Sequence, residues 1–149
     1  MKKFALVLAA MVLVLAVPAA AQDNGSGSCS TQTVRGNYSV TCTGFVSPAA
    51  NAPQVPFTAM AALACTWGGS CTAAGMVSLG GAILQQSVSG VAVVNPDCTG
   101  TITYDQKLNG QPGPKLNIIF HILDGGNQML GMSVDPGTNM LCTLRLISR

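Results

Sequence analysis

Few residues of this sequence are suited to catalysis, and His121 comes first because it is the only histidine. A serine nucleophile needs a histidine base and an acid within hydrogen-bonding reach. The chain has no Gly-x-Ser-x-Gly segment, which is the sharp turn that presents such a serine in many hydrolases. A triad would therefore depend on the fold alone to bring a serine and an aspartate to His121, and the sequence assigns no catalytic residue.

The carboxylates indicate turns rather than acid–base chemistry. All five acidic residues are aspartates, and a pair for glycoside hydrolysis would have to come from them. Asp97, Asp124 and Asp135 each stand beside Pro, Gly or Cys, where aspartate commonly bonds its own backbone. Asp105 is the exception. No glycine-rich phosphate loop is present, so the turn interpretation is favoured over paired catalytic carboxylates.

Five residues are candidates for binding a small molecule, since such a pocket is mostly apolar with a few polar anchors. Asn117 and His121 share one side of a predicted strand, and Arg145 lies in the middle of another. If these three side chains point into the fold, they supply the polar anchors of the pocket. Tyr104 lies at the end of a further strand and is a fourth candidate. Trp67 lies in a loop that could cover one end of the pocket. The alternative is that the polar side chains face solvent or form hydrogen bonds, while Trp67 covers the core.

The clearest structural pattern runs from Leu116 to Val134 and predicts two strands joined by Asp124-Gly125-Gly126-Asn127. In the first strand Leu116, Ile118, Phe120 and Ile122 share one face, because successive side chains of a strand point to opposite sides. The glycines supply the positive φ that a tight hairpin loop needs.

Alternation of apolar and polar residues predicts the other strands. In residues 36–43 the side chains of Tyr38, Val40 and Cys42 share a face, and in residues 57–65 an apolar stripe repeats at every second position. Residues 75–81 and 82–87 are expected to form a strand pair or one bent strand. Further strands are expected over residues 87–94, 98–104 and 140–147, with a turn-rich link at 105–115. About eight short strands without a helix are typical of an antiparallel sandwich or barrel, and a barrel leaves no open edge.

The six cysteines lie at positions 29, 42, 65, 71, 98 and 142. An even number in an exported chain implies disulfides. Cys65 and Cys71 bracket a short loop, which favours a local bridge. Cys42 lies in the first predicted strand and Cys142 in the last, and closure of a barrel would bring them together. A zinc site is disfavoured because the chain has no Cys-x-x-Cys pair and one histidine, so neither a metal nor a cofactor is expected.

The segments Cys29-Ser30, Val34 to Tyr38, Val94 to Thr101 and Asp124-Gly125-Gly126 resemble a family of exported bacterial proteins. These proteins are similar to small calycin-like β-barrels of the lipocalin or avidin type. The resemblance covers nearly all of the mature chain, and Asp97-Cys98-Thr99-Gly100-Thr101 is its most distinctive stretch. It implies a calycin-like meander barrel and a Cys29–Cys98 disulfide, the pair that remains after the other two. The four further cysteines depart from the family's simplest pattern, and the resemblance brings no activity with it.

The N-terminus predicts export. Met1-Lys2-Lys3 precedes an apolar run that ends in Pro18-Ala19-Ala20-Ala21, the pattern of a secretory signal peptide cleaved near Ala21. We expect a signal peptide at residues 1–21, a flexible leader at 22–34 and a disulfide-stabilised barrel at 35–149. No later segment is long and apolar enough for a membrane-spanning helix, which needs about 20 residues. The destination is the periplasm or the exterior.

Charge narrows the set of partners. Cleavage removes two of the seven basic residues, so five basic side chains balance five aspartates in the mature chain. No Lys/Arg cluster remains to bind phosphates, which disfavours a nucleic-acid partner. Three hypotheses follow: an exported barrel that binds a small apolar or amphipathic molecule, a structural envelope protein with a filled barrel, and a small cyclase- or isomerase-type enzyme that uses His121 or Tyr104 with an aspartate. The oligomeric state is left open.

Overall fold

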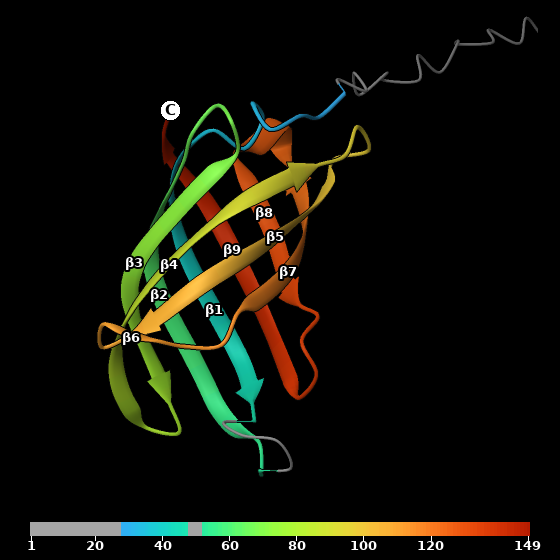
Figure 1. Cartoon of the computed structure of the whole chain (residues 1–149). Helices are drawn as coiled ribbons and strands as arrows, with labels where there is room; N and C mark the ends of the chain where they lie inside the picture. The colour runs from blue at the N-terminus through green and yellow to red at the C-terminus, as the bar shows by residue number, and fades with distance from the viewer. Residues whose placement is uncertain (1–27, 48–51) are drawn as a thin grey trace, which may run out of the picture.

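The computed structural model describes residues 28–47 and 52–149, so the expected signal peptide and the first part of the leader lie outside the described residues. Figure 1 shows a chain built of strands. In chain order the elements are β1 (Gly36–Val46), β2 (Val55–Cys65), β3 (Ser70–Leu79), β4 (Ala82–Val94), β5 (Thr99–Leu108), β6 (Gln111–Pro112), β7 (Leu116–Leu123), the 3-10 turn η1 (Asp124–Gly126), β8 (Gln128–Ser133) and β9 (Thr138–Ser148).

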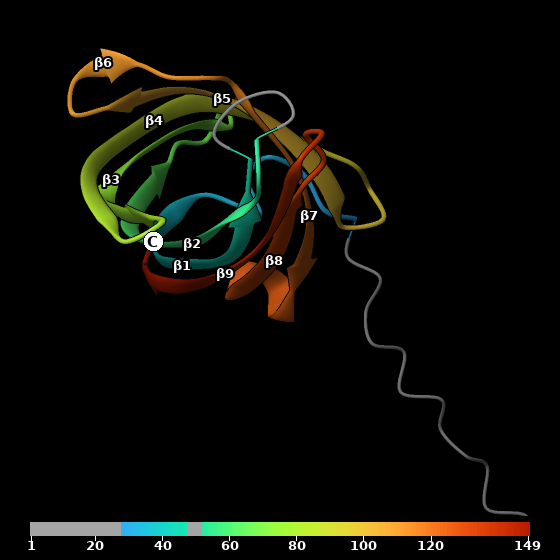
Figure 2. The ribbon, with the colours of Figure 1, turned by 90° about the horizontal axis from the view of Figure 1, so that it is seen from below.

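Eight of the strands close into one antiparallel barrel. The sheet order is β4-β3-β2-β1-β9-β8-β7-β5-β6, and β4 also pairs with β5, which completes the ring. The two-residue β6 pairs only with the end of β5 and is not part of that ring. Figure 2 shows the strands curving around a common interior. The prediction of an all-β meander barrel of about eight strands is therefore confirmed.

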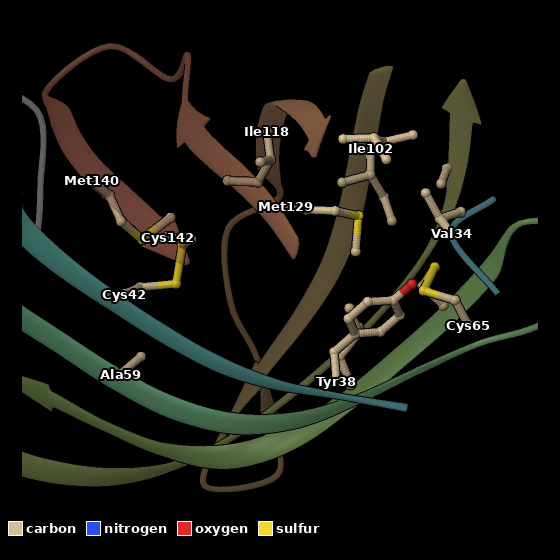
Figure 3. Close-up of a cluster of buried hydrophobic side chains, with 14 of the residues drawn as sticks. Val34, Tyr38, Cys42, Ala59, Cys65, Ile102, Ile118, Met129, Met140 and Cys142 are labelled. Carbon is tan, nitrogen blue, oxygen red and sulfur yellow. A yellow bond between two sulfur atoms is a disulfide. The ribbon is translucent and has the colours of Figure 1, made fainter. Parts of the chain in front are cut away.

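Alternation along the strands separates the interior from the outer wall. Tyr38 and Cys42 of β1 are buried, whereas Asn37, Thr41 and Thr43 between and beside them are exposed. On β2 the predicted stripe faces inward, with Phe57, Ala59, Leu63 and Cys65 all buried. Figure 3 shows side chains from several strands converging on this interior. Burial of the apolar face is the main stabilising contribution to such a domain.

The hairpin over residues 116–134 is confirmed. Ile118 pairs with Ser133 and Leu123 with Gln128, so β7 and β8 are direct antiparallel neighbours. Its loop contains the short turn η1, in which Gly125 and Gly126 have φ values of 60° and 92°. The Asn127 side-chain amide donates to an Asp124 carboxylate oxygen at 3.2 Å. The glycines and the Asx contact together explain why the chain reverses here.

Two expected boundaries are wrong. Residues 82–87 and 87–94 are one continuous strand, β4, and Gly80-Gly81 is the hairpin turn that joins it to β3. Residues 105–108 belong to β5 rather than to a link, because they pair with residues 86–89 of β4. The polar residues Gln86, Ser87 and Asp105 interrupt the apolar pattern at these two boundaries. The backbone hydrogen bonds between β4 and β5 nevertheless continue through them.

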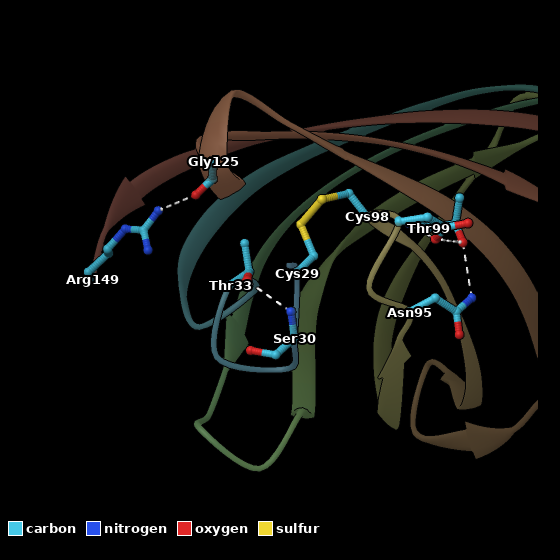
Figure 4. The surroundings of a disulfide bond; sticks show 9 residues. Cys29, Ser30, Thr33, Asn95, Cys98, Thr99, Gly125 and Arg149 are labelled. Carbon is cyan, nitrogen blue, oxygen red and sulfur yellow. Dashed lines mark hydrogen bonds between the residues drawn. A yellow bond between two sulfur atoms is a disulfide. The ribbon is translucent and has the colours of Figure 1, made fainter. Parts of the chain in front are cut away.

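Three disulfides cross-link the barrel, and they join the three pairs of cysteines that were predicted from the sequence. Cys42–Cys142 links β1 to β9 at directly opposed positions, across the seam where the first and last strands meet. Cys65–Cys71 links opposed positions of β2 and β3. Cys29–Cys98 ties the segment before β1 to the β4–β5 loop (Figure 4).

One end of the barrel is closed by residues 28–35, part of which we expected in a flexible leader. Two consecutive turns form there, with the Thr33 amide donating to the Ser30 carbonyl at 2.9 Å and the Arg35 amide to the Gln32 carbonyl at 3.2 Å. They carry Val34 into the barrel, where 1% of its surface is exposed. Next to it, Tyr38 is fully buried and its hydroxyl donates to the Gly126 carbonyl at 3.1 Å. This described part of the leader is therefore packed structure.

Candidate functional site

The barrel interior contains a cavity of about 100 Å³. Side chains from all eight barrel strands line it, together with Val34 from the closing segment. Apolar groups make up nearly the whole lining, and representatives are Val40, Phe57, Val88, Ile102, Ile118 and Met140. The cavity therefore follows directly from the inward face of the strand alternation.

Several inward side chains in the middle of strands are only partly buried. The cavity is lined by Val40, Ala61, Ala73 and Val88, and each of them keeps some accessible surface. A close-packed core leaves such positions without accessible surface. Because these side chains line the cavity, the barrel is incompletely filled. Small side chains such as Ala61 and Ala73 contribute to this space because larger residues would occupy it.

Two glycines leave room for the aromatic rings of the lining. A Cβ atom on Gly100 would lie 2.3 Å from Cζ of Phe120, its partner across the β5–β7 pair. A Cβ atom on Gly90 would clash with the Thr103 carbonyl oxygen and lie 3.1 Å from Cδ1 of Tyr104, its partner across the β4–β5 pair. Both glycines therefore let an aromatic ring lie against the wall, which sets the shape of the cavity.

The polar groups of the lining are few. Tyr104 and Gln86 reach the cavity from the neighbouring strands β5 and β4. The Gln86 side-chain amide donates to the side-chain carbonyl of Gln106, which is buried. Within the described residues the Gln86 carbonyl oxygen has no donor, and the Tyr104 hydroxyl forms no hydrogen bond to protein. These two groups are available to a bound molecule.

Burial controls the ionisation of the Tyr104 hydroxyl. Desolvation raises the pKa of Tyr104 to about 12, because an apolar environment disfavours the charged phenolate. Tyr104 is therefore neutral at physiological pH and presents a hydroxyl that can both donate and accept a hydrogen bond.

Only one of the five candidate binding residues lies in the cavity. Tyr104 does, whereas His121 and Arg145 are exposed on the outer wall. Asn117 is also on the outer side, where it donates to Asp135 and accepts from the Thr103 hydroxyl. These three therefore do not point into the barrel. Successive side chains of a strand point to opposite faces, and Asn117 and His121 alternate with the inward residues of β7.

Trp67 lies outside the cavity as well. Its side chain is 56% exposed in the loop between β2 and β3. The guanidinium carbon of Arg35 is 4.2 Å from the centre of the Trp67 ring, in a cation–π contact. Arg35 follows Val34 in the segment that closes the barrel. Trp67 thus holds the closing segment from outside and does not contact the interior.

The arrangement that the enzyme hypothesis requires is not assembled in the described residues. No carboxylate lines the cavity that contains Tyr104. His121 is on the outer wall near Asp97, whose pKa is lowered mainly by hydrogen bonds from Thr99, with a smaller contribution from His121. Across residues 28–47 and 52–149, no group of three or more His, Cys, Asp or Glu side chains is placed to hold a metal ion.

A second concavity lies on the outer wall, over β5, β7, β8 and β9. This groove of about 470 Å³ is lined by apolar side chains, among them Ile119, Leu130, Met132 and Leu141, with His121 and Asn95 beside them. Ile119 pairs with Met132, and Met132 pairs with Leu141, so these three form a row across adjacent strands. The groove is open, and its apolar residues are exposed.

Gln86 and Gln106 were not predicted from the sequence as residues of the interior. Gln86 shares the inward face of β4 with Leu84 and Val88, and Gln106 shares the inward face of β5 with Tyr104. The signal that identifies them is the continuation of period two through residues 84–88 and 102–108, which is recognisable only if β4 and β5 are not interrupted. Glutamines at inward positions of a barrel must find partners, and these two pair with each other.

No helix of the described part is long and apolar enough to cross a membrane. Comparison of the chain with protein-family models, with curated proteins and with solved structures finds no match. The closed barrel and its interior cavity are therefore the features of the protein that bear on its function.

Proposed function

We propose that this protein binds a small, mainly apolar molecule inside the barrel. The observation that carries the proposal is the incompletely filled interior, in which inward side chains at mid-strand keep accessible surface. An eight-stranded barrel is at the size where side chains either just fill the interior or leave room for one ligand. Here the small residues and glycines of the lining favour the second case.

The volume limits the size of the ligand. Pockets for drug-sized molecules are typically about 300–1,000 Å³, well above the 100 Å³ of this cavity. A dry apolar cavity of roughly 150 Å³ in another protein binds benzene or xenon. The expected ligand is therefore no larger than about one six-membered ring or a short chain.

Export and a calycin-like barrel are part of the proposed role. The signal-peptide pattern at residues 1–21 supports export. The three disulfides of the chain agree with an oxidising compartment. The calycin-like assignment is supported by the meander order of the barrel strands and by the sequence resemblance around Asp97 to Thr101.

Filling the cavity is expected to abolish ligand binding. Ala61→Leu adds three carbon atoms that point inward into the cavity. At a benzene concentration of about five times the dissociation constant, the free energy of unfolding of the wild type should rise by about 1 kcal/mol. That corresponds to a rise in melting temperature of roughly 2–8 °C. Ala61→Leu should show no rise, as measured by thermal denaturation with and without benzene.

Ala62→Leu is the matched control, because Ala62 is the next residue of β2 and is exposed on the outer wall. It should retain the full response to benzene. Absence of any stabilisation of the wild type across the soluble range of benzene, or an equal response from Ala61→Leu, contradicts interior binding.

A second candidate function is an interaction role through the outer wall. The observation that favours it is the row of exposed apolar side chains at the groove, with Met132 48% and Leu141 58% exposed. Contiguous apolar surface of this kind is typical of interaction sites. Of the described residues that line the groove, none is charged when His121 is neutral, so a second copy of the chain is a suitable partner.

Sedimentation velocity separates this candidate from interior binding. If the outer wall mediates self-association, the wild type sediments as an oligomer and Met132→Asp as a monomer. Met60→Asp is the control, since Met60 is 64% exposed on β2, three strands away from β8, and should leave the oligomer intact. A wild-type protein that sediments as a monomer at high micromolar concentration removes this candidate.

A further inference from the structure

Among the described residues that line the cavity, Tyr104 has the only ionisable side chain. The charged residues of the described chain lie at the ends of the barrel or on its outer wall, such as Lys115, whose ammonium group is 2.6 Å from an Asp105 oxygen with both side chains exposed. A carboxylate or ammonium group inside the barrel would lose its hydration without gaining a counter-ion, which is strongly unfavourable. The interior therefore selects against charged molecules.

The two available polar groups select a particular kind of neutral molecule. The Tyr104 hydroxyl can donate or accept, and the Gln86 carbonyl oxygen can accept. A ligand hydroxyl suits the Tyr104 hydroxyl in particular, because it can accept a hydrogen bond from the tyrosine or donate one to it. A hydrocarbon leaves both groups without a partner, and in an apolar enclosure an unmatched polar group weakens binding.

The geometry points to a neutral ligand of about one ring's size that carries a hydroxyl group, with Tyr104 as the specificity-determining residue. This inference rests on the proposed function, since it names the ligand class of the same cavity. The apolar body of the ligand contacts residues such as Ile102 and Ile118, and its hydroxyl is directed toward the wall formed by β4 and β5.

Three probes of similar size test the inference: phenol, benzene and benzoate. Isothermal titration calorimetry of the full mature chain at pH 7 should show phenol binding about fivefold more tightly than benzene, the effect of one net hydrogen bond. Benzoate should bind at least about a hundredfold more weakly than phenol, because its carboxylate is ionised. Tyr104→Phe should abolish the preference for phenol, so that phenol and benzene bind this variant with the same affinity within about twofold.

Tyr38→Phe is the matched control. It removes the same atom from the other tyrosine, whose hydroxyl is bonded to Gly126 and whose side chain is not part of the cavity lining. The ratio of phenol to benzene affinity should stay at the wild-type value in this variant. Circular dichroism of each variant verifies that the barrel is folded.

The outcomes distinguish failure of the proposed interior site from failure of the inferred ligand class. If none of the three probes binds, the proposed interior site fails. If benzene binds but phenol binds no better, if benzoate binds as well as phenol, or if Tyr104→Phe keeps the phenol preference, then the site stands and the inferred ligand class is wrong.

Discussion

Replacing Cys42 and Cys142 together by alanine is expected to lower the free energy of unfolding by about 4–5 kcal/mol. The two residues are 100 positions apart in sequence, and a cross-link that closes a loop of about 100 residues restricts the unfolded chain by roughly 4.7 kcal/mol at 25 °C. The bridge also joins β1 to β9, the pair that closes the ring. Domains of this size are stable by about 5–15 kcal/mol, so this variant should be close to unfolding at 37 °C. Urea denaturation without reductant measures the difference.

The Cys65→Ala/Cys71→Ala variant is a closely matched control. These cysteines also oppose each other on adjacent strands and are also buried, so the loss of packing is similar. Their separation is only 6 residues, which gives a contribution of roughly 2 kcal/mol from the unfolded chain. If both double variants lose the same stability, the Cys42–Cys142 bridge does not act through the long loop that it closes.

Alkaline pH is expected to destabilise the protein through Tyr104. The pKa of this residue is about 12 in the folded chain and about 10 in an unfolded one. Between these values the folded state holds the proton that the unfolded state has lost, so stability is complete below pH 10 and decreases as pH rises toward 12. The loss from Tyr104 between pH 9 and pH 12 should be about 2 kcal/mol.

The difference between wild type and Tyr104→Phe isolates this contribution, because other groups also titrate at high pH. Burial raises the pKa of Tyr38 as well, partly offset by Arg149, and Tyr38 is present in both proteins. Urea midpoints of the two proteins at pH 9 and pH 12 give the result. A difference between them that does not change with pH would show that the Tyr104 hydroxyl is solvated and that its site is not apolar.

The architecture follows from alternation that is visible in the sequence. Phe57, Ala59 and Ala61 repeat at every second position although alanine also suits helices, and the resulting prediction of a strand is confirmed by β2. Closure of a barrel brings the first and last strands together, which predicts a bridge between Cys42 and Cys142, and the structure has it.

The residues of the candidate site are harder to predict from the sequence than the strands are. His121 and Asn117 attract attention because they are the polar residues of an apolar strand, yet the same alternation that makes β7 amphipathic places them on the outer wall. Gln86 lies inside, but a polar residue at an inward position resembles the end of a strand. Only pairing with Gln106, a residue of another strand, makes its burial favourable, and sequence periodicity does not report such long-range partners.

The most direct test of the central claim is methyl NMR of the protein during titration with phenol. Inward methyl groups of Val40, Val88, Ile102 and Ile118 line the cavity, while Val91, Val93 and Ile119 are exposed on the outer wall. Binding inside the barrel predicts saturable shifts at the inward set and none at the outward set. Shifts confined to the outward set, or no saturable shift at any methyl group, would contradict a ligand site in the barrel interior.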